Sequence, residues 1–196
     1  MSSRDLILQR VQASQPQGRV LPAVEQPANA ATFDVVHKFT EVLNAIGGKV
    51  VLVPEGQTVA EAVREVYGQQ AAILSVSQYA TFDTLPDDST ANPHMLQDTE
   101  VTLMDAQFGV AENGAVWLTE NEYKVRALPF ICTHLAVVLK REALVPYMHH
   151  AYQRINAGGD YNFGLFIAGP SKTADIEQSL VLGAHGPKTM TVFLVG

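Results

Sequence analysis

Helical segments and short apolar runs alternate along the first half of the chain. Residues 32–46 carry apolar side chains at helical spacing, and the run KVVLV at 49–53 follows directly. Such a nearly all-apolar run is typical of a strand buried on both faces. A second helical segment over 58–68 precedes a second apolar run over 71–76. The order helix, strand, helix, strand with short joints predicts an α/β fold with a mostly parallel sheet flanked by helices.

The ends of the two helices carry their own signals. Gly47 and Gly48 are expected to stop the first helix. Thr58 is expected to cap the second helix, with Glu61 completing a capping box, and the helix should end near Gly68. The further expected elements are a strand over 101–104, a hairpin over 106–120, strands over 131–139, 165–168 and 190–195, and helices over 142–155 and 171–182.

The N-terminal part of the chain differs from the rest. The opening MSSRDLILQRVQAS places apolar residues three and four apart with charges between them, which predicts an amphipathic helix without the apolar core of a signal peptide. The proline-rich stretch that follows is typical of an extended arm. We therefore divide the chain into an N-terminal helix and arm over 1–31 and a single α/β domain over 32–196.

Composition and charge exclude several classes of function. The 196-residue chain has a net charge of −7 and no basic stripe, which disfavours nucleic acid and anionic membranes as partners. Its longest apolar stretch, 127–139, contains polar residues and is shorter than the ~18 residues of a membrane span. Cys132 is the single cysteine, so this chain alone cannot form a disulfide or a cysteine-ligated zinc or iron–sulfur site. We expect a cytoplasmic protein with no metal or redox cofactor of its own.

The segment GVAENGAVWL at 109–118 is the first candidate for chemistry. Asn113 and Gly114 form the preferred pair for a type I′ turn, so one interpretation is a hairpin in which Glu112 is a solvated carboxylate. In the other interpretation Glu112 is a nucleophile or base held beside a rigid turn, and the small Ala111 and Gly114 let a substrate approach closely. Both interpretations stay open at this point.

The segment LFIAGPSKTADIE, which begins at Leu165, is the second candidate. A strand is expected to lead into a helix capped by Ser171, whose free N–H groups would suit a carboxylate or phosphate. Ordinary helix capping is the alternative. The candidate anion-binding residues of this segment are Ser171, Lys172, Thr173, Asp175 and Glu177.

The loop GAHGP at 183–187 is the third candidate, and its His185 is a further candidate for binding the substrate or an anion. A helix C-cap followed by a proline stop is the alternative. Two other residues are expected to be structural. His134 should be a satisfied residue of a strand, and Cys132 an inert buried thiol.

The run GPSKTADIE at 169–177, then GAHGP and a terminal apolar strand, resembles the C-terminal signature of the LUD (lactate utilisation) domain. The opening Ser3-Arg4-Asp5-x-Ile7-Leu8 is similar to that of its LutC-type members, and the single cysteine favours this type over the cysteine-rich LutB type. The resemblance covers essentially the whole chain. It implies the fold shared by glucosamine-6-phosphate deaminases, ribose-5-phosphate isomerases and CoA transferases, the NagB/RpiA/CoA-transferase-like fold.

The resemblance also implies a function. A LutC-like subunit would take part in oxidising L-lactate to pyruvate with iron–sulfur partner proteins, would bind a small carboxylate or phosphate, and could form a homo-oligomer. The run AENG at 111–114 is similar to the Ser-Glu-Asn-Gly motif of CoA transferases, with Ala111 in place of the serine. The LUD pattern here more often reads Ala-Glu-Thr-Gly-Thr, from which Asn113 and Ala115 depart. The alternative function is therefore a self-sufficient CoA-transferase-like or sugar-phosphate isomerase-like enzyme that uses Glu112.

Overall fold

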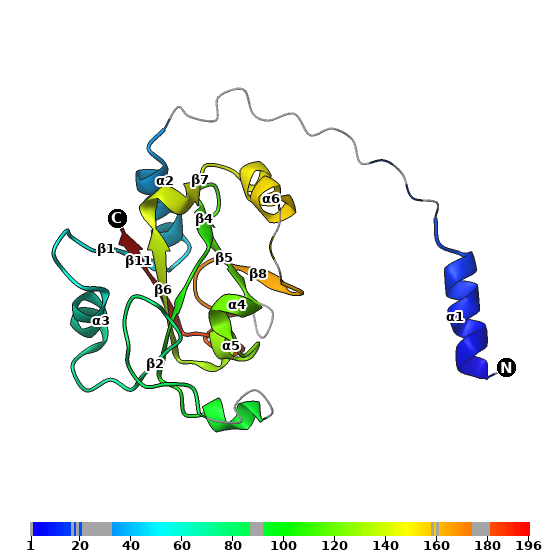
Figure 1. Cartoon of the computed structure of the whole chain (residues 1–196), viewed down its shortest axis with the longest axis horizontal. Helices are drawn as coiled ribbons and strands as arrows, with labels where there is room; N and C mark the ends of the chain where they lie inside the picture. Colours follow the sequence, from blue (N-terminus) through cyan, green and yellow to red (C-terminus); the bar gives the residue numbers. More distant parts are fainter. Residues whose placement is uncertain are drawn as a thin grey trace.

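The computed structural model of the chain describes residues 2–16, 18, 20, 33–86, 92–157, 159, 161–173 and 181–196. A five-stranded sheet lies at its centre, and all neighbouring strands in this sheet are parallel (Figure 1). The spatial order is β1 (Lys49–Leu52), β11 (Thr189–Val195), β6 (His134–Lys140), β3 (Val101–Asp105) and β2 (Ile73–Ser75). The predicted α/β class with a mostly parallel sheet is confirmed.

Each face of the central sheet is covered by a separate hydrophobic core. Helix α3 (Val59–Tyr67) packs on one face, where Val63 and Phe193 are fully buried. Helix α2 (Val35–Ala45) and a second sheet pack on the other face, where Phe39 and Leu43 are fully buried. Burial on both faces explains why the central strands of the sheet consist almost wholly of apolar residues.

The second sheet follows the order β7 (Leu144–Val145), β4 (Phe108–Val110), β5 (Ala115–Thr119) and β8 (Gly164–Ile167). Strands β4 and β5 form the predicted antiparallel hairpin. An aromatic core, in which Phe108 stacks on Trp117, lies between this sheet and α6 (Met148–Asn156). The remaining elements are α1 (Ser3–Ala13), η1 (Pro93–Leu96), α4 (Glu120–Tyr123), α5 (Leu128–Ile131), η2 (Arg141–Ala143), β9 (Lys172–Thr173) and β10 (Val181–Leu182).

Both predicted ends of the helix over 58–68 are confirmed. Thr58 and Glu61 form a reciprocal capping box at the start of α3, and Gly68 ends that helix with a φ of 89°. The N-terminal helix is present as α1, and none of its residues is buried. Within the described ranges, every helix is too short or too polar to span a bilayer.

Three local predictions are wrong. Strand β1 is an edge strand that pairs only with β11, so its Leu52 is 52% exposed rather than buried. The connection between β4 and β5 is a four-residue loop over 111–114 in which Gly114 has a positive φ and Asn113 does not, so it is not a type I′ turn. The helix expected over 142–155 begins only at Met148. The residue before Pro146 is pushed out of the helical region and extends as β7 instead.

Candidate functional site

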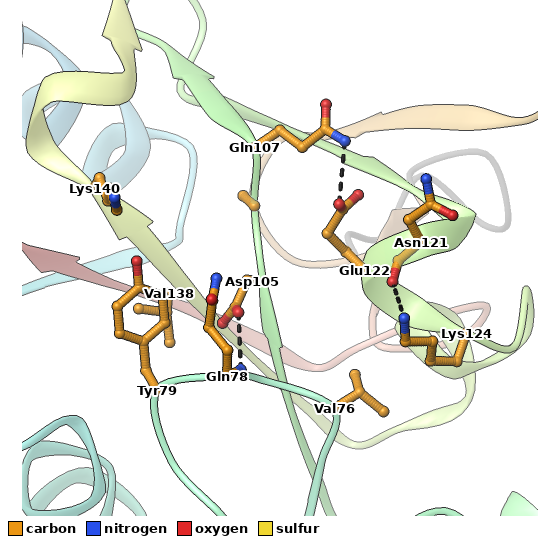
Figure 2. Close-up of a pocket in the computed structure, with 11 residues that line it drawn as sticks. Val76, Gln78, Tyr79, Asp105, Gln107, Asn121, Glu122, Lys124, Val138 and Lys140 are labelled. Atoms are coloured by element: carbon orange, nitrogen blue, oxygen red, sulfur yellow. Dashed lines mark hydrogen bonds between the residues drawn. The ribbon is translucent and has the colours of Figure 1, made fainter. Parts of the chain in front are cut away.

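A pocket of about 420 Å³ opens where strands β2, β3 and β6 end (Figure 2). The loops after β2 and β3, the carboxyl end of β6 and helix α4 line it. Ligands of open α/β sheets usually bind outside the carboxyl ends of the parallel strands. The volume also lies within the range of ~300–1,000 Å³ that is typical of small-molecule sites. This pocket is therefore the first candidate for a functional site.

Asp105, the last residue of β3, holds the loop that follows β2. One carboxylate oxygen accepts a hydrogen bond from the Ser77 hydroxyl, and the other accepts one from the Gln78 N–H at 3.0 Å. The Ser77 hydroxyl also accepts a hydrogen bond from the Tyr79 N–H at 3.1 Å. These bonds fix Tyr79 on the side of the pocket that Lys140 shares (Figure 2).

Glu122 orders the opposite wall. Its Oε1 accepts a hydrogen bond from Gln107 Nε2 at 3.1 Å. Its Oε2 accepts hydrogen bonds from the N–H and the hydroxyl of Thr119, both at 2.7 Å, in the capping box that starts α4. Three donors thus fix this carboxylate and offset its charge.

Lys124 follows α4 in a strained backbone conformation. Its φ is 60° and its ψ is −46°, and no other non-glycine residue in the described part of the chain has a positive φ. The Val125 N–H donates to the Tyr123 carbonyl at 2.6 Å, which closes a tight γ-turn around Lys124. Backbone strain at non-glycine residues is concentrated at binding and catalytic sites, so the turn favours a functional role for Lys124.

The charges of the pocket favour an anionic ligand. Both carboxylates, Asp105 and Glu122, already accept hydrogen bonds from the protein. The Lys124 ammonium donates a hydrogen bond to the Asn121 carbonyl. Lys140 makes an exposed ion pair with Glu142 at 3.7 Å, and such a pair offsets little of its charge. Lys124 and Lys140 therefore face the pocket from its two sides as its least compensated charges (Figure 2). Among the described residues, no cluster of His, Cys, Asp and Glu could hold a metal ion.

Glu112 lies outside this pocket. It follows the C-terminal end of β4, whereas the pocket residue Gln107 precedes the N-terminal end of the same strand. Its Oε2 accepts a hydrogen bond at 2.8 Å from the N–H of Met148, the first residue of α6. The N-cap residue of α6, Tyr147, makes no side-chain cap. A carboxylate 36 residues away in the chain therefore caps this helix, where it also interacts favourably with the helix dipole.

The turn after Glu112 packs against α2. Asn113 Oδ1 accepts a hydrogen bond from the Ala115 N–H at 3.0 Å. Gly114 has a φ of +70°, and a Cβ there would lie 3.1 Å from the Cα and N atoms of Leu43. Ala111 is fully buried in the core. Helix α2 thus fills the space beside Gly114 that was expected to admit a substrate.

The helix predicted to start at Ser171 is wrong. Lys172 and Thr173 form β9, which pairs antiparallel with β10. The Ser171 N–H donates to the Pro187 carbonyl at 2.9 Å, and the Ser171 carbonyl accepts from the Gly183 N–H at 3.0 Å. These bonds engage the Ser171 backbone with the returning chain, so this segment offers no free helix start for an anion.

The anion-binding residues expected in this region do not converge on one point. Lys172 Nζ donates to the carbonyl of Ile46 at the C-terminus of α2, where a cation is favoured. His185 is exposed, in a loop whose Gly186 lies against Ser171. Asp175 and Glu177 lie outside the described residues.

The structural expectations for two interior residues are confirmed. Burial raises the pKa of the Cys132 thiol to about 11, and the neighbouring Thr102 partly opposes this shift. His134 Nδ1 contacts the Thr189 hydroxyl at 2.8 Å, so this ring nitrogen is satisfied.

The pocket residues are not among the predicted site residues, although most of them carried a signal in the sequence. Ser77 and Gln78 follow one buried strand, Asp105 and Gln107 another, and Lys140 ends a third. Polar side chains directly after consecutive buried strands mark the carboxyl edge of a parallel sheet. The tight turn at residue 124 had no comparable signal, because it depends on how α4 ends.

Comparison with known proteins gives a consistent assignment. The family model described as LUD domain matches residues 76–195. Lactate utilization protein C from Shouchella clausii is 27% identical, with a match that covers 88% of this chain and 83% of that protein. The protein of the same name from Bacillus pumilus is 28% identical over 60% of this chain and 56% of its own length. Other matches are shorter: the chain spans about half the length of two curated relatives, 56% of the Bacillus pumilus protein and 47% of the protein of the same name from Oceanobacillus iheyensis.

A solved structure shares the fold. The crystal structure of a DUF162 family protein from Deinococcus radiodurans superposes with a TM-score of 0.61 and 16% sequence identity, covering 83% of this chain and 96% of that chain. The LUD domain match includes every residue that lines the pocket and three of the five central strands, β3, β6 and β11. On this match, the chain belongs to the LUD domain family.

Proposed function

We propose that this chain is a LutC-like subunit of an L-lactate utilisation system and that its pocket binds the carboxylate of a small hydroxy or keto acid. The pathway is supported by the relatives named lactate utilization protein C. The observation that carries the ligand class is the pair of ammonium groups, Lys124 and Lys140, on the two sides of the pocket. The neighbouring carboxylates are already engaged by protein donors, so they oppose an anion less than free carboxylates would.

The groups that line the pocket match the two functional groups of a 2-hydroxy acid. Ammonium groups can donate to both carboxylate oxygens of the ligand. The ligand hydroxyl can donate to a remaining lone pair of Asp105 or Glu122. Tyr79 and Gln107 add further polar contacts at the rim. In this proposal the pocket positions the acid.

In this proposal the redox step takes place together with other proteins. Oxidation of L-lactate to pyruvate releases two electrons and two protons. The proposal assigns the electrons to iron–sulfur partner proteins, because the single cysteine of this chain cannot by itself ligate a cluster. The chain would work in the cytoplasm without a cofactor of its own, as a site for the acid and a surface on which the partners assemble.

Calorimetric titration with L-lactate and pyruvate tests the ligand assignment. Lys124→Met and Lys140→Met should each raise the dissociation constant about tenfold, which corresponds to about 1.4 kcal/mol. Lys38→Met is the matched control, because Lys38 pairs with Glu41 on the surface of α2 and does not line the pocket. Equal affinities in all four proteins would refute the assignment.

Lactate-dependent dye reduction by the purified assembly tests the pathway role. The rate should fall when this chain is omitted from the iron–sulfur partners and should recover when it is added back. A rate that does not depend on this chain would refute the subunit role even if the pocket binds lactate.

The alternative enzyme that uses Glu112 on an acyl or sugar-phosphate substrate has no comparable support. Glu112 caps α6, and Gly114, two residues later, is packed against α2. A helix cap of this kind accounts for the carboxylate at this position without any chemistry.

A further inference from the structure

A second cavity, also of about 420 Å³, lies at the amino ends of β1, β6 and β11. The strand register places Lys49 beside Thr191, and His134 beside Thr189. Because side chains alternate along a strand, all four share the α3 face with the buried apolar residues farther along the same strands. A row of polar side chains thus follows the amino end of a sheet face that is otherwise apolar.

Tyr67, the last residue of α3, also lines this cavity. Its hydroxyl is buried and has no hydrogen-bond partner among the described residues. Burial raises the pKa of Tyr67 to about 12, and the nearby Thr191 side chain partly opposes this shift. The phenol is therefore a neutral O–H donor at neutral pH.

An unpartnered buried hydroxyl is destabilising, because the group loses its hydrogen bonds to water without replacement. A bound acceptor would remove this loss. Lys49, which is exposed at the start of β1, adds a positive charge at the mouth of the same cavity. A neutral donor inside and a cation at the mouth together form a surface that suits oxygen anions.

We propose that this cavity binds a small oxyanion, either a carboxylate or a phosphate, whose oxygens accept hydrogen bonds from Tyr67 and Lys49. The site is separate from the pocket described above, because His134 and Lys140 mark opposite ends of β6. Six residue steps along a strand span about 20 Å. The two sites therefore lie at opposite ends of the parallel strands, the first pocket at their carboxyl ends and this cavity at their amino ends.

Glu100 provides a test of whether the bound ligand is negatively or positively charged. It lines the same cavity, and one of its carboxylate oxygens accepts a hydrogen bond from the Ala72 N–H at 3.3 Å. Its negative charge repels an anion and attracts a cation. The variant Glu100→Gln should therefore bind an oxyanion more tightly than the unmodified chain, whereas a cation would bind it less tightly.

The experiment is a calorimetric titration of the full chain with inorganic phosphate and, separately, with acetate. It is done in a Lys140→Met background, so that carboxylate binding at the other pocket is weakened. Tyr67→Phe and Lys49→Met should each raise the dissociation constant about tenfold or more, and Lys38→Met should leave it unchanged. Binding of phosphate alone or of acetate alone supports the site and identifies the class of oxyanion.

Three results would overturn the proposal: no binding of either anion at millimolar concentration, binding that survives both Tyr67→Phe and Lys49→Met, or weaker binding by Glu100→Gln. Tyr67→Phe removes one unpartnered oxygen from the interior, so the variant is expected to fold, and its melting temperature checks this. As a local readout, the ring proton signals of His134 should shift when the anion binds. Loss of lactate binding at the other pocket leaves all these measurements unaffected.

Discussion

Replacement of Glu112 distinguishes a structural carboxylate from a catalytic one. Its Oε2 accepts the Met148 N–H at 2.8 Å, and α6 has no side-chain cap from its own N-cap residue. Glu112→Ala removes both the acceptor and the charge. Glu112→Gln keeps an acceptor oxygen and removes only the charge.

The expected magnitudes follow from these contacts. Loss of a helix cap lowers the free energy of unfolding by about 1 kcal/mol, which is the expectation for Glu112→Ala. Loss of the charge alone at a helix N-terminus costs about 0.5 kcal/mol, which is the expectation for Glu112→Gln. For a chain of this size, 1 kcal/mol corresponds to about 3 °C in melting temperature. We therefore expect decreases of about 3 °C for the alanine variant and 1–2 °C for the glutamine variant.

Differential scanning calorimetry measures both shifts, and growth on L-lactate measures function. Glu41→Gln is the matched control, because Glu41 is an exposed carboxylate on the surface of α2. We expect Glu112→Gln to support growth. An unchanged melting temperature in Glu112→Ala would refute the capping role. Lost growth in Glu112→Gln with an unchanged melting temperature would show that the carboxylate acts chemically.

Three further predictions concern stability. Gly114→Ala should lower the free energy of unfolding in urea by about 2 kcal/mol, because the φ of Gly114 is +70° and the new Cβ would meet Leu43. Gly56→Ala is the control: its φ is +88° but a Cβ there has no atom within 4 Å, so this variant should show only the smaller loss that comes from the backbone conformation. Burial raises the pKa of Cys132 from 9.0 to about 11, so the unfolded chain loses the thiol proton at a lower pH than the folded one. The contribution of Cys132 to the free energy of unfolding should therefore be constant below pH 9 and fall as the pH rises toward 11. Ellman's reagent should label the native thiol far more slowly than the unfolded one. Lys172→Met should lower the melting temperature slightly, through loss of the α2 cap, and leave lactate affinity unchanged in calorimetry.

The central sheet could be predicted from the sequence because its strands are under one simple constraint. Strands covered on both faces must be apolar throughout, and the runs over 71–76, 101–104 and 190–195 each contain or closely match an observed strand. The rule is weaker at the two sheet edges. Strand β1 has an equally apolar sequence although its Leu52 is exposed, and in β2, at the other edge, only Ile73 is buried. Strand order depends on how the chain crosses the sheet, which the composition of a single strand does not encode.

The wrong helix start at Ser171 has a different cause. A small polar residue after Gly-Pro is a strong local helix-start signal. The backbone of Ser171 instead bonds to Gly183 and Pro187, which lie more than ten residues farther along the chain. Local propensity has no access to such partners. The pocket was missed for the same reason, since its residues come together only when β2, β3 and β6 are placed side by side.

The two glycine-containing segments that stand out in the sequence meet the same helix. Gly114 lies against the backbone of Leu43, and Gly169, with a φ of +74°, lies against the carbonyl of Ile46, which also accepts a hydrogen bond from Lys172. Both contacts need a glycine because the α2 backbone approaches too closely for a Cβ. The most recognisable residues of this chain therefore hold α2 against the ends of the second sheet, whereas the residues that line the first pocket follow the strand ends between residues 76 and 140. Substitutions in the glycine segments should consequently change stability first, and substitutions in the pocket should change affinity first.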